Sequence, residues 1–133
     1  MGIIIENSKN IELKNNVVAD FIQHGIWVKR SSDITIEGNW VHHVPPEVDK
    51  IPVVKEYPIL QPFAIGGITA TQGTARITMK NNIVSGTWHH AFHFKPLNMG
   101  KDCADPDDDN NNFVFEGNIA HSISGYGAIA LNV

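Results

Sequence analysis

A short pattern occurs four times in this chain, and it constrains the fold more than any other feature. The copies read IELKNNVV, ITIEGNWV, ITMKNNIV and FVFEGNIA, and they align on Asn16, Asn39, Asn82 and Asn118. In every copy, apolar residues stand three and five positions before the asparagine. This period of two predicts a β-strand that turns its apolar residues to one face.

A second column of small residues lies nine positions after the asparagine column. It contains Gly25, Ala91 and Gly127, which begin the segments GIWV, AFHF and GAIA. Gly2 stands fourteen residues before Asn16, so GIII at the start fits the same column, and nine plus fourteen gives a turn of 23 residues. We expect the strands of this column to bury Ile3, Ile5, Ile26, Val28, Ile68, Ala70, Phe92, Phe94, Ala128 and Ala130.

Several short strands per turn and a constant period are what a parallel β-helix requires, in which each turn stacks on the last. The sequence predicts an all-β, right-handed parallel β-helix of about four turns. Two corner insertions lengthen it: the proline-rich loop 45–62 and the acidic loop 98–112. The length of 133 residues fits a single domain, residues 1–133. An antiparallel sandwich is the alternative, but the repeat lacks an Asn-Gly hairpin signal.

The asparagine column predicts a structural ladder. An inward asparagine at a tight corner can hydrogen-bond the backbone and the asparagine of the next turn, and it tolerates the left-handed conformation that such a corner needs. Two positions before it, the outward residues alternate in charge, and they are Lys14, Glu37, Lys80 and Glu116. Alternating charges disfavour a slipped register.

The composition argues against several classes of partner. The net charge is −4 and charged residues make up 18% of the chain, so it has no basic field for nucleic acid. No apolar run is long enough for membrane insertion. Neither end shows a polar cap, so we expect further β-helix turns to cover both ends: the chain is either a segment of a longer solenoid or a unit whose copies stack end to end. The single Cys103 leaves no internal disulfide.

Three segments resemble the parallel β-helix repeats of fibrocystin-type proteins, which are related to those of G8-domain cell-surface hyaluronidases. The segments are NNVVADFIQHGIWVKRSSDITIEGNWVHHV, NNIVSGTWHHAFHFKP and FEGNIAHSISGYGAIAL. The resemblance covers residues 11–44 and 77–133. It implies a right-handed solenoid in a large extracellular or cell-surface protein, with an architectural or ligand-binding role.

Histidines and tryptophans mark a candidate ligand face. The columns place His24 level with His90 and Trp27 level with His93, two turns apart, which is too far for one zinc site. We therefore expect an outward face of imidazole and aromatic rings that stacks on sugars. Its members are Trp27, Trp40, Trp88 and His93.

The acidic loop offers a weak cation site. Asp105, Asp107 and Asp109 have the alternating spacing of a calcium loop, yet Asn110 stands where such a loop needs glycine. The preferred interpretation is a solvent-exposed acidic loop, so we expect no metal and no other cofactor. A calcium site is the alternative.

An enzyme on this fold would be a polysaccharide lyase or a glycoside hydrolase. Hydrolysis needs two converging carboxylates, whereas Asp20 and Asp33 fall at different corners of the turn. We therefore expect no catalytic residues and a non-enzymatic structural module of an extracellular, cell-surface or filamentous assembly. Glycan binding is the alternative, followed by a carbohydrate-active enzyme.

Overall fold

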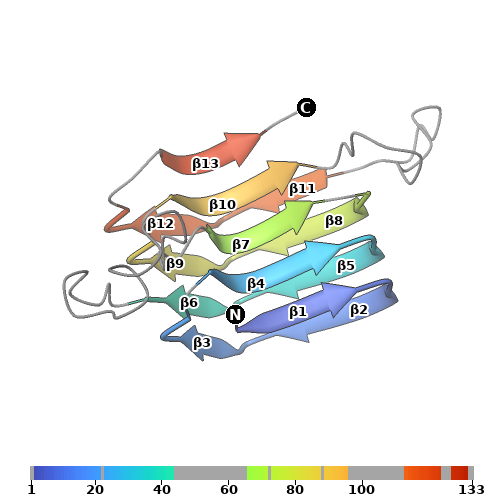
Figure 1. Ribbon diagram of the computed structural model, residues 1–133, viewed down its shortest axis with the longest axis horizontal. Coiled ribbons are helices and arrows are strands. Elements are labelled where there is room, and N and C mark those ends of the chain that lie inside the picture. Colours follow the sequence, from blue (N-terminus) through green and yellow to red (C-terminus); the bar gives the residue numbers. More distant parts are fainter. Residues whose placement is uncertain are drawn as a thin grey trace, which may run out of the picture.

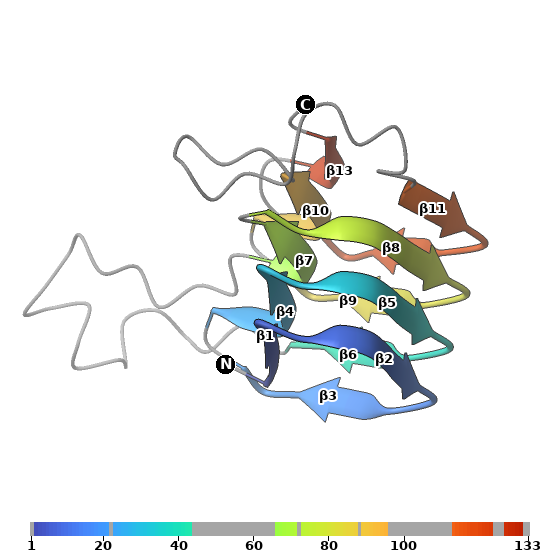
Figure 2. The ribbon, with the colours of Figure 1, turned by 90° about the vertical axis from the view of Figure 1, so that its right-hand side faces the viewer.

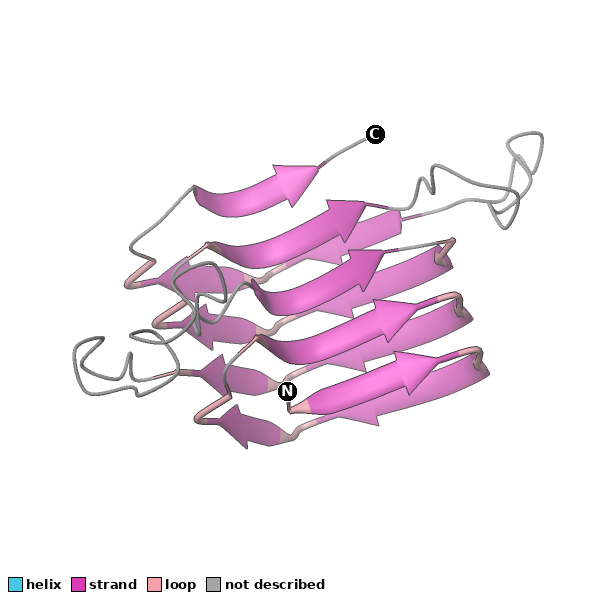
Figure 3. Cartoon of the chain, in the orientation of Figure 1, coloured by secondary structure: helices cyan, strands magenta, loops and turns pink. Residues whose placement is uncertain are grey.

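The chain folds into strands and tight turns throughout the part that the structure describes. The computed structural model describes residues 2–21, 23–43, 66–71, 73–87, 89–95, 113–123 and 127–131. No helix occurs in these ranges (Figure 3), and none of their segments is therefore a helix able to cross a membrane. The predicted loops 45–62 and 98–112 lie outside the described residues, as does Cys103.

The strands form three parallel sheets, which we call A, B and C. Sheet A has the strand order β1 (Ile3–Glu6), β4 (His24–Lys29), β7 (Gly66–Thr71), β10 (His90–Lys95) and β13 (Gly127–Leu131). Sheet B has the order β2 (Lys9–Lys14), β5 (Ser32–Glu37), β8 (Ala75–Lys80) and β11 (Phe113–Glu116). Sheet C has the order β3 (Val17–Ala19), β6 (Trp40–His42), β9 (Ile83–Ser85) and β12 (Ile119–His121).

The path of the chain is a coil. Each turn passes through sheets A, B and C in sequence and then re-enters sheet A one strand further along (Figure 1). Seen from the side, β2, β5 and β8 lie in one stack beside the stack of β3, β6 and β9 (Figure 2). Ile11 lies level with Ile34 and Ile34 with Ile77, as the asparagine column predicts. The predicted parallel β-helix is confirmed.

The core is a set of apolar columns that run along the axis of the coil. Sheet A contributes Ile26, Ile68 and Phe92 from successive turns, and each of these side chains is at most 2% exposed. Sheet B contributes Ile36 and Met79, which lie level with each other and are fully buried. Each large apolar side chain that leaves water contributes about 1.5–3 kcal/mol, so the stacked columns are the main source of stability.

Close packing at one corner explains the glycines of the second column. A Cβ atom on Gly25 would lie 2.2 Å from Cγ1 of Val41, and a Cβ atom on Gly67 would lie 2.1 Å from Cγ1 of Val84. The valines of sheet C therefore occupy the space where a side chain at the start of a sheet A strand would stand. Only glycine leaves them enough room there.

The last turn departs from the predicted register by one residue. Gly127 lies level with His90, so the column position level with Ala91 is taken by Ala128. Phe92 consequently lies level with Ile129, and the prediction that Ala128 and Ala130 belong to the inward row is wrong. The reason is the corner between sheets C and A, which holds one residue more in this turn than in the turn of Asn82.

Candidate functional site

The asparagine column forms a directional hydrogen-bond ladder. The backbone N–H and the Nδ2 of Asn39 both donate to Oδ1 of Asn82, at 3.0 Å each. Asn16 donates in the same way to Asn39, and Asn82 donates in the same way to Asn118. The side chain of each asparagine above the first also donates from Nδ2 to a backbone carbonyl one turn below. The ladder therefore ties each turn to the next at the corner between sheets B and C.

The left-handed residue of this corner precedes the ladder asparagine. Positive φ angles occur at Asn15 (55°), Gly38 (65°), Asn81 (53°) and Gly117 (64°). The prediction that the ladder asparagines themselves adopt this conformation is wrong. The two positions have different roles. The first residue adopts the left-handed conformation that turns the backbone, and the ladder asparagine that follows directs its side-chain amide inward, where it bonds the neighbouring turns.

Opposite charges follow each other up the outside of sheet B. Lys14 lies 3.6 Å from Glu37, measured from Nζ to Oε2, and Lys80 lies 3.1 Å from Glu116. Glu37 and Lys80 are level with each other in adjacent strands. Hydrogen bonding to Glu12 and the charge of Glu12, with a smaller effect from Glu37, raise the pKa of Lys14. More than a third of each of these side chains is accessible to solvent, so the column favours one register more than it adds stability.

The core is less well covered at the two terminal turns than in the middle ones. Ile34 and Ile77 are at most 1% exposed, whereas Ile11 and Phe113, in the same column, are only partly buried. In β13, Ile129 is 51% exposed, although it lies level with the buried Phe92.

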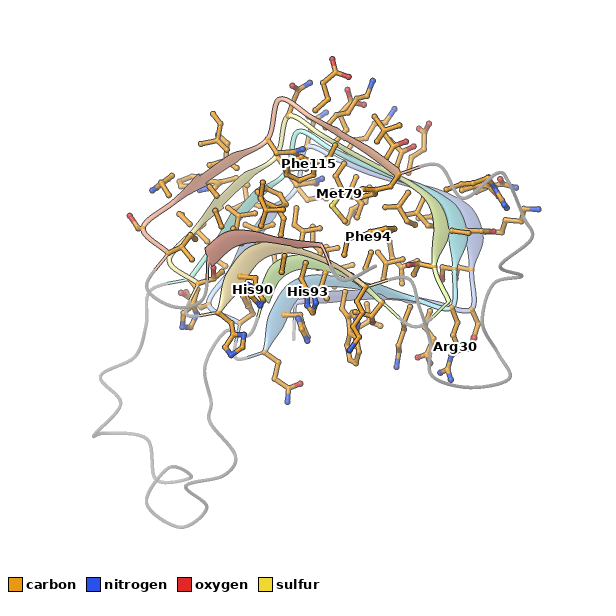
Figure 4. The ribbon with its side chains drawn as sticks, turned by 90° about the horizontal axis from the view of Figure 1, so that it is seen from above. Arg30, Met79, His90, His93, Phe94 and Phe115 are labelled. Carbon is orange, nitrogen blue, oxygen red and sulfur yellow. The ribbon has the colours of Figure 1, made fainter. Side chains whose placement is uncertain are left out.

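An apolar hollow opens on the turn of β11 and β13. It is lined by Met79, Phe92, His93, Phe94, Phe113, Phe115 and Ile129. Seen along the axis, Met79, Phe94 and Phe115 point into the space between the sheets (Figure 4). The ring of Phe94 stacks on that of Phe113 with centroids 3.9 Å apart. A segment that packs on this surface would contact aromatic and aliphatic carbon atoms.

The outward face of sheet A carries the predicted imidazole group. His24 and His90 both lie level with Gly66, two strands apart from each other, as predicted. A Cβ atom at Gly66 would lie 2.3 Å from Oγ1 of Thr69, so glycine leaves room for the contact of Thr69 with Nδ1 of His24 at 3.0 Å. His90 and His93 point away from the core on this side (Figure 4).

Burial disfavours the protonated form of two imidazoles on this face, those of His24 and His93. It lowers the pKa of His24 to about 4, with smaller effects from the charges of His93 and the amino terminus. It also lowers the pKa of His93, assisted by the charges of His90, Lys95 and His89. No three metal-ligating side chains of the described residues converge on one point.

The tryptophans do not share one face. Trp27 lies on sheet A, where its Nε1 donates to Oγ1 of Thr71 at 2.9 Å and Nζ of Lys29 lies 4.7 Å from its ring. Trp40 lies on sheet C, with its ring tilted by 36° against that of His42 and the centroids 4.6 Å apart. The prediction that Trp40 belongs beside Trp27 and His93 is therefore wrong, and Trp88 lies outside the described residues.

Sheet C carries an exposed apolar row that the sequence analysis did not recognise. Its members are level with one another, and they are Val17, Trp40, Ile83 and Ile119. Their exposed fractions range from 38% at Ile83 to 64% at Val17. The signal was present in the sequence, because each residue directly follows a ladder asparagine, the position where the chain enters sheet C.

The predicted calcium residues Asp105, Asp107 and Asp109 lie outside the described residues, so the calcium site stays a prediction. Glu116 stands at the twelfth place counted from Asp105, where a calcium loop carries a bidentate glutamate, and it faces outward and pairs with Lys80.

One family model matches the chain. It is described as a right-handed beta helix region, and it matches residues 1–95. No curated protein and no solved structure matches. The match confirms the right-handed β-helix that the columns and the stacked sheets indicate. The finer relation to fibrocystin-type repeats stays a prediction.

Proposed function

We propose that this chain, which belongs to the right-handed β-helix family, is a non-enzymatic structural module of an extracellular, cell-surface or filamentous assembly. The module lengthens by stacking β-helix turns end to end. A parallel strand at the edge of a stack has unpaired backbone groups, and it accepts another strand readily. The location outside the cell rests on the resemblance to fibrocystin-type repeats.

One observation carries this proposal, namely the exposed core at the terminal turns. Residues that are fully buried in the middle turns have counterparts in β2, β11 and β13 that are partly or half exposed, such as Ile11, Phe113 and Ile129. A further turn placed on either edge would remove this apolar surface from water. Burial of apolar surface is the main favourable term in protein association. The contact is head to tail and does not close, so its product is a filament.

Concentration-dependent assembly tests the proposal. Sedimentation velocity and negative-stain microscopy of the 133-residue chain are expected to show rods that lengthen as the protein concentration rises. A monodisperse monomer at every concentration would contradict stacking. Turnover of uronic-acid polymers by the purified chain would contradict the non-enzymatic role and favour a polysaccharide lyase or hydrolase.

Glycan binding is the second candidate, and the apolar row on sheet C favours it. Trp40 is 48% exposed, and its neighbours in the row, Val17 and Ile83, are uncharged. An exposed indole in such surroundings can stack on the apolar face of a sugar ring. By contrast, Lys29 lies over the ring of Trp27, so that indole is less available.

Oligosaccharide titration followed by NMR chemical shifts tests this second function. Trp40→Ala is expected to abolish shifts that Trp27→Ala leaves in place. If neither wild type nor variant responds to any oligosaccharide in a panel of neutral and uronic-acid glycans, glycan binding is excluded for that panel.

A further inference from the structure

Sheet A has one strand more than sheets B and C. Its five strands end with β13, whereas the four strands of sheet B end with β11 and the four of sheet C end with β12. Among the described residues, no strand of sheet B therefore lies beside β13, and β11 pairs on one side only, with β8 (Figure 1). We call this place, next to β11 in sheet B and in the layer of β13, the open position.

The inner side of the open position is apolar. Phe113 and Phe115 of β11 lie next to it, Ile129 of β13 lies opposite, and all three line the apolar hollow described above. In the layer of β11 the rings meet across the coil: Phe94 stacks on Phe113 at 3.9 Å between centroids, and Phe92 meets Phe115 edge-on at 5.0 Å. A strand in the open position would place inward side chains on the two β11 rings and against Ile129. Apolar residues at two alternate positions fit this surface.

The outer side of the open position favours a cation. Glu37 lies level with both Lys14 and Lys80 in the charge column, and 39% of its side chain is exposed. In the described part of the chain, Glu116 has a lysine on one side only, and 70% of its side chain is exposed. The charge column alternates, so the residue that would lie level with Glu116 in the open position is expected to be lysine or arginine.

The corner after β11 favours an asparagine. In each step of the ladder, the asparagine nearer to the β11 edge accepts two bonds from its neighbour and donates one from Nδ2 to a backbone carbonyl. That carbonyl always belongs to the residue of the previous turn that occupies the column of Phe115, and these residues are Leu13, Ile36 and Met79.

Asn118 is the last asparagine of the ladder. Its Nδ2 donates to Met79, but its backbone N–H meets no acceptor among the described residues. An asparagine in the open position could accept bonds from Asn118 and donate one to the carbonyl of Phe115. Alanine could do neither, because it has no amide group.

We propose that the open position binds an extended segment of another polypeptide, which adds to sheet B as a fifth parallel strand. Its sequence pattern is apolar, any, apolar, basic, any, asparagine, with the basic residue level with Glu116 and the asparagine level with Asn118. In such strand addition, backbone hydrogen bonds supply affinity and the alternate side chains supply specificity. The inference rests on the edge pairing of the proposed function, although it does not require copies to stack.

A whole second copy cannot supply this strand. In the chain, β1 precedes β2, so seating β2 of a second copy on β11 would bring its β1 into the layer of sheet A that β13 occupies. If β1 of the second copy pairs with β13 instead, its β2 lies one layer further along and the open position stays unfilled. The partner is therefore a segment that enters sheet B without a sheet A strand before it.

A peptide from this chain's own first turn serves as the probe. Residues 9–18, KNIELKNNVV, contain the pattern, with Ile11, Leu13, Lys14 and Asn16 at the required places. Fluorescence anisotropy of the labelled peptide is expected to show saturable binding to the full chain, at protein concentrations below those at which rods form. The peptide with Asn16→Ala is expected to bind on the order of tenfold more weakly, because it loses its bonds to Asn118 and to the carbonyl of Phe115. Equal affinities of the two peptides would overturn the inference.

Charge exchange tests the outer side of the open position. The peptide with Lys14→Glu is expected to bind the wild-type chain about twofold to fivefold more weakly than the unchanged peptide. Glu116→Lys in the chain is expected to reverse this preference. The peptide with Lys9→Glu is the matched control, since the same charge change lies away from Glu116 and its effect is not reversed. If Glu116→Lys leaves the preference at position 14 unchanged, the proposed register is overturned.

Cross-linking shows which edge the peptide occupies. In a Cys103→Ser background, the chain carries Ile119→Cys and the peptide carries Val17→Cys, two residues that are level in the proposed register. Level residues of neighbouring strands lie about 4.8 Å apart, within reach of a disulfide. A chain with Val17→Cys is the matched control at the opposite edge, because position 17 is 64% exposed and position 119 is 54% exposed. The Ile119→Cys chain is expected to form on the order of tenfold more disulfide with the peptide.

The outcomes separate this inference from the proposed function. Binding that depends on Asn16 of the peptide, in a chain that never forms rods, supports the inference and contradicts end-to-end stacking. Rods without peptide binding overturn the inference and leave stacking in place. Cross-linking that is equal at positions 17 and 119, or stronger at position 17, also overturns the inference. If the chain neither forms rods nor binds the peptide, both proposals fall.

Discussion

Oδ1 of Asn82 accepts two hydrogen bonds from Asn39, one from its backbone N–H and one from its Nδ2, although the residues are 43 positions apart in the chain. The proline-rich insertion lies between them in the sequence, yet the bonds have the same geometry as those between Asn16 and Asn39, which are 23 positions apart. A corner amide therefore holds adjacent turns together regardless of the length of chain that connects them.

Removal of the Asn82 amide is expected to destabilise the coil strongly. Asn82 is fully buried, and Asn82→Ala removes the acceptor of the backbone N–H of Asn39 and the side-chain donor to the carbonyl of Ile36. A buried polar group that loses its partner costs about 1–3 kcal/mol, so we expect a loss on the order of 3 kcal/mol in the free energy of unfolding. Urea denaturation followed by circular dichroism measures it.

Asn16→Ala is the matched control for Asn82→Ala. Asn16 is only partly buried, and it accepts no side-chain bond from within the described part of the chain. We expect it to cost about 1 kcal/mol, the net value of a typical hydrogen bond. Equal losses at the two positions would mean that the buried ladder is no stronger than its exposed end.

Most of the fold could be predicted from the sequence, because stacking forces equivalent residues into level positions. The spacing of Ile11, Ile34 and Ile77 from the ladder asparagines predicted their shared column, and strand pairing confirms it. A shift of one residue in this spacing would move the apolar side chains of the strand from the core face to the solvent face. The hydrophobic pattern and the register therefore depend on each other.

The incorrect predictions concern positions at which two interpretations fit the sequence equally well. Gly127 and Ala128 are both small, so either one fits the column that contains Gly25 and Ala91, and only strand pairing shows that Ala128 occupies it. The strands of sheet C are three residues long, too short for a period of two to become visible. For that reason the predicted outward face placed Trp40, which lies on sheet C, together with Trp27, which lies on sheet A.

Gly38 and Asn15 form a second test of the corner. Gly38 has a φ of 65°, and a Cβ atom there would lie 2.5 Å from Oδ1 of Asn15. Gly38→Ala is expected to cost about 1–2 kcal/mol from the left-handed conformation alone, with a further loss from the clash. In the double variant Asn15→Ala/Gly38→Ala the clash is absent, so the free-energy losses are expected to be less than additive. Strict additivity in urea denaturation would show that Asn15 does not restrict position 38.

Gly25→Ala tests the close approach of sheets A and C. The new methyl group would lie 2.2 Å from Cγ1 of Val41 and 2.8 Å from the carbonyl oxygen of Gly67, and a strand backbone cannot move away without breaking its ladder. Overpacking of a tight core costs about 1–3 kcal/mol, and we expect the upper part of this range. Thermal unfolding measures the loss. A variant as stable as the wild type would mean that the two sheets separate easily at this corner.

His24 is expected to make the stability of the coil depend on pH in the acidic range. Burial lowers its pKa in the folded chain to about 4, from 6.5 in the unfolded chain, so the unfolded chain binds the proton first as the pH falls. The contribution of the neutral ring is fully present above pH 6.5 and decreases as the pH falls toward 4. The slope cannot exceed about 1.4 kcal/mol per pH unit for one proton, and partial exposure of the ring reduces the total to about 2 kcal/mol.

The variant His24→Gln isolates this contribution, because glutamine keeps a polar group near Oγ1 of Thr69 and does not titrate. Burial also lowers the pKa values of His43, His89 and His93, so wild type and variant both lose stability in acid. The difference in their free energies of unfolding, measured with urea at a series of pH values, carries the effect of His24 alone. We expect this difference to change by about 2 kcal/mol between pH 7 and pH 4, in the direction that favours the variant in acid. A difference that stays constant would show that the ring of His24 is as well solvated in the folded chain as in the unfolded one.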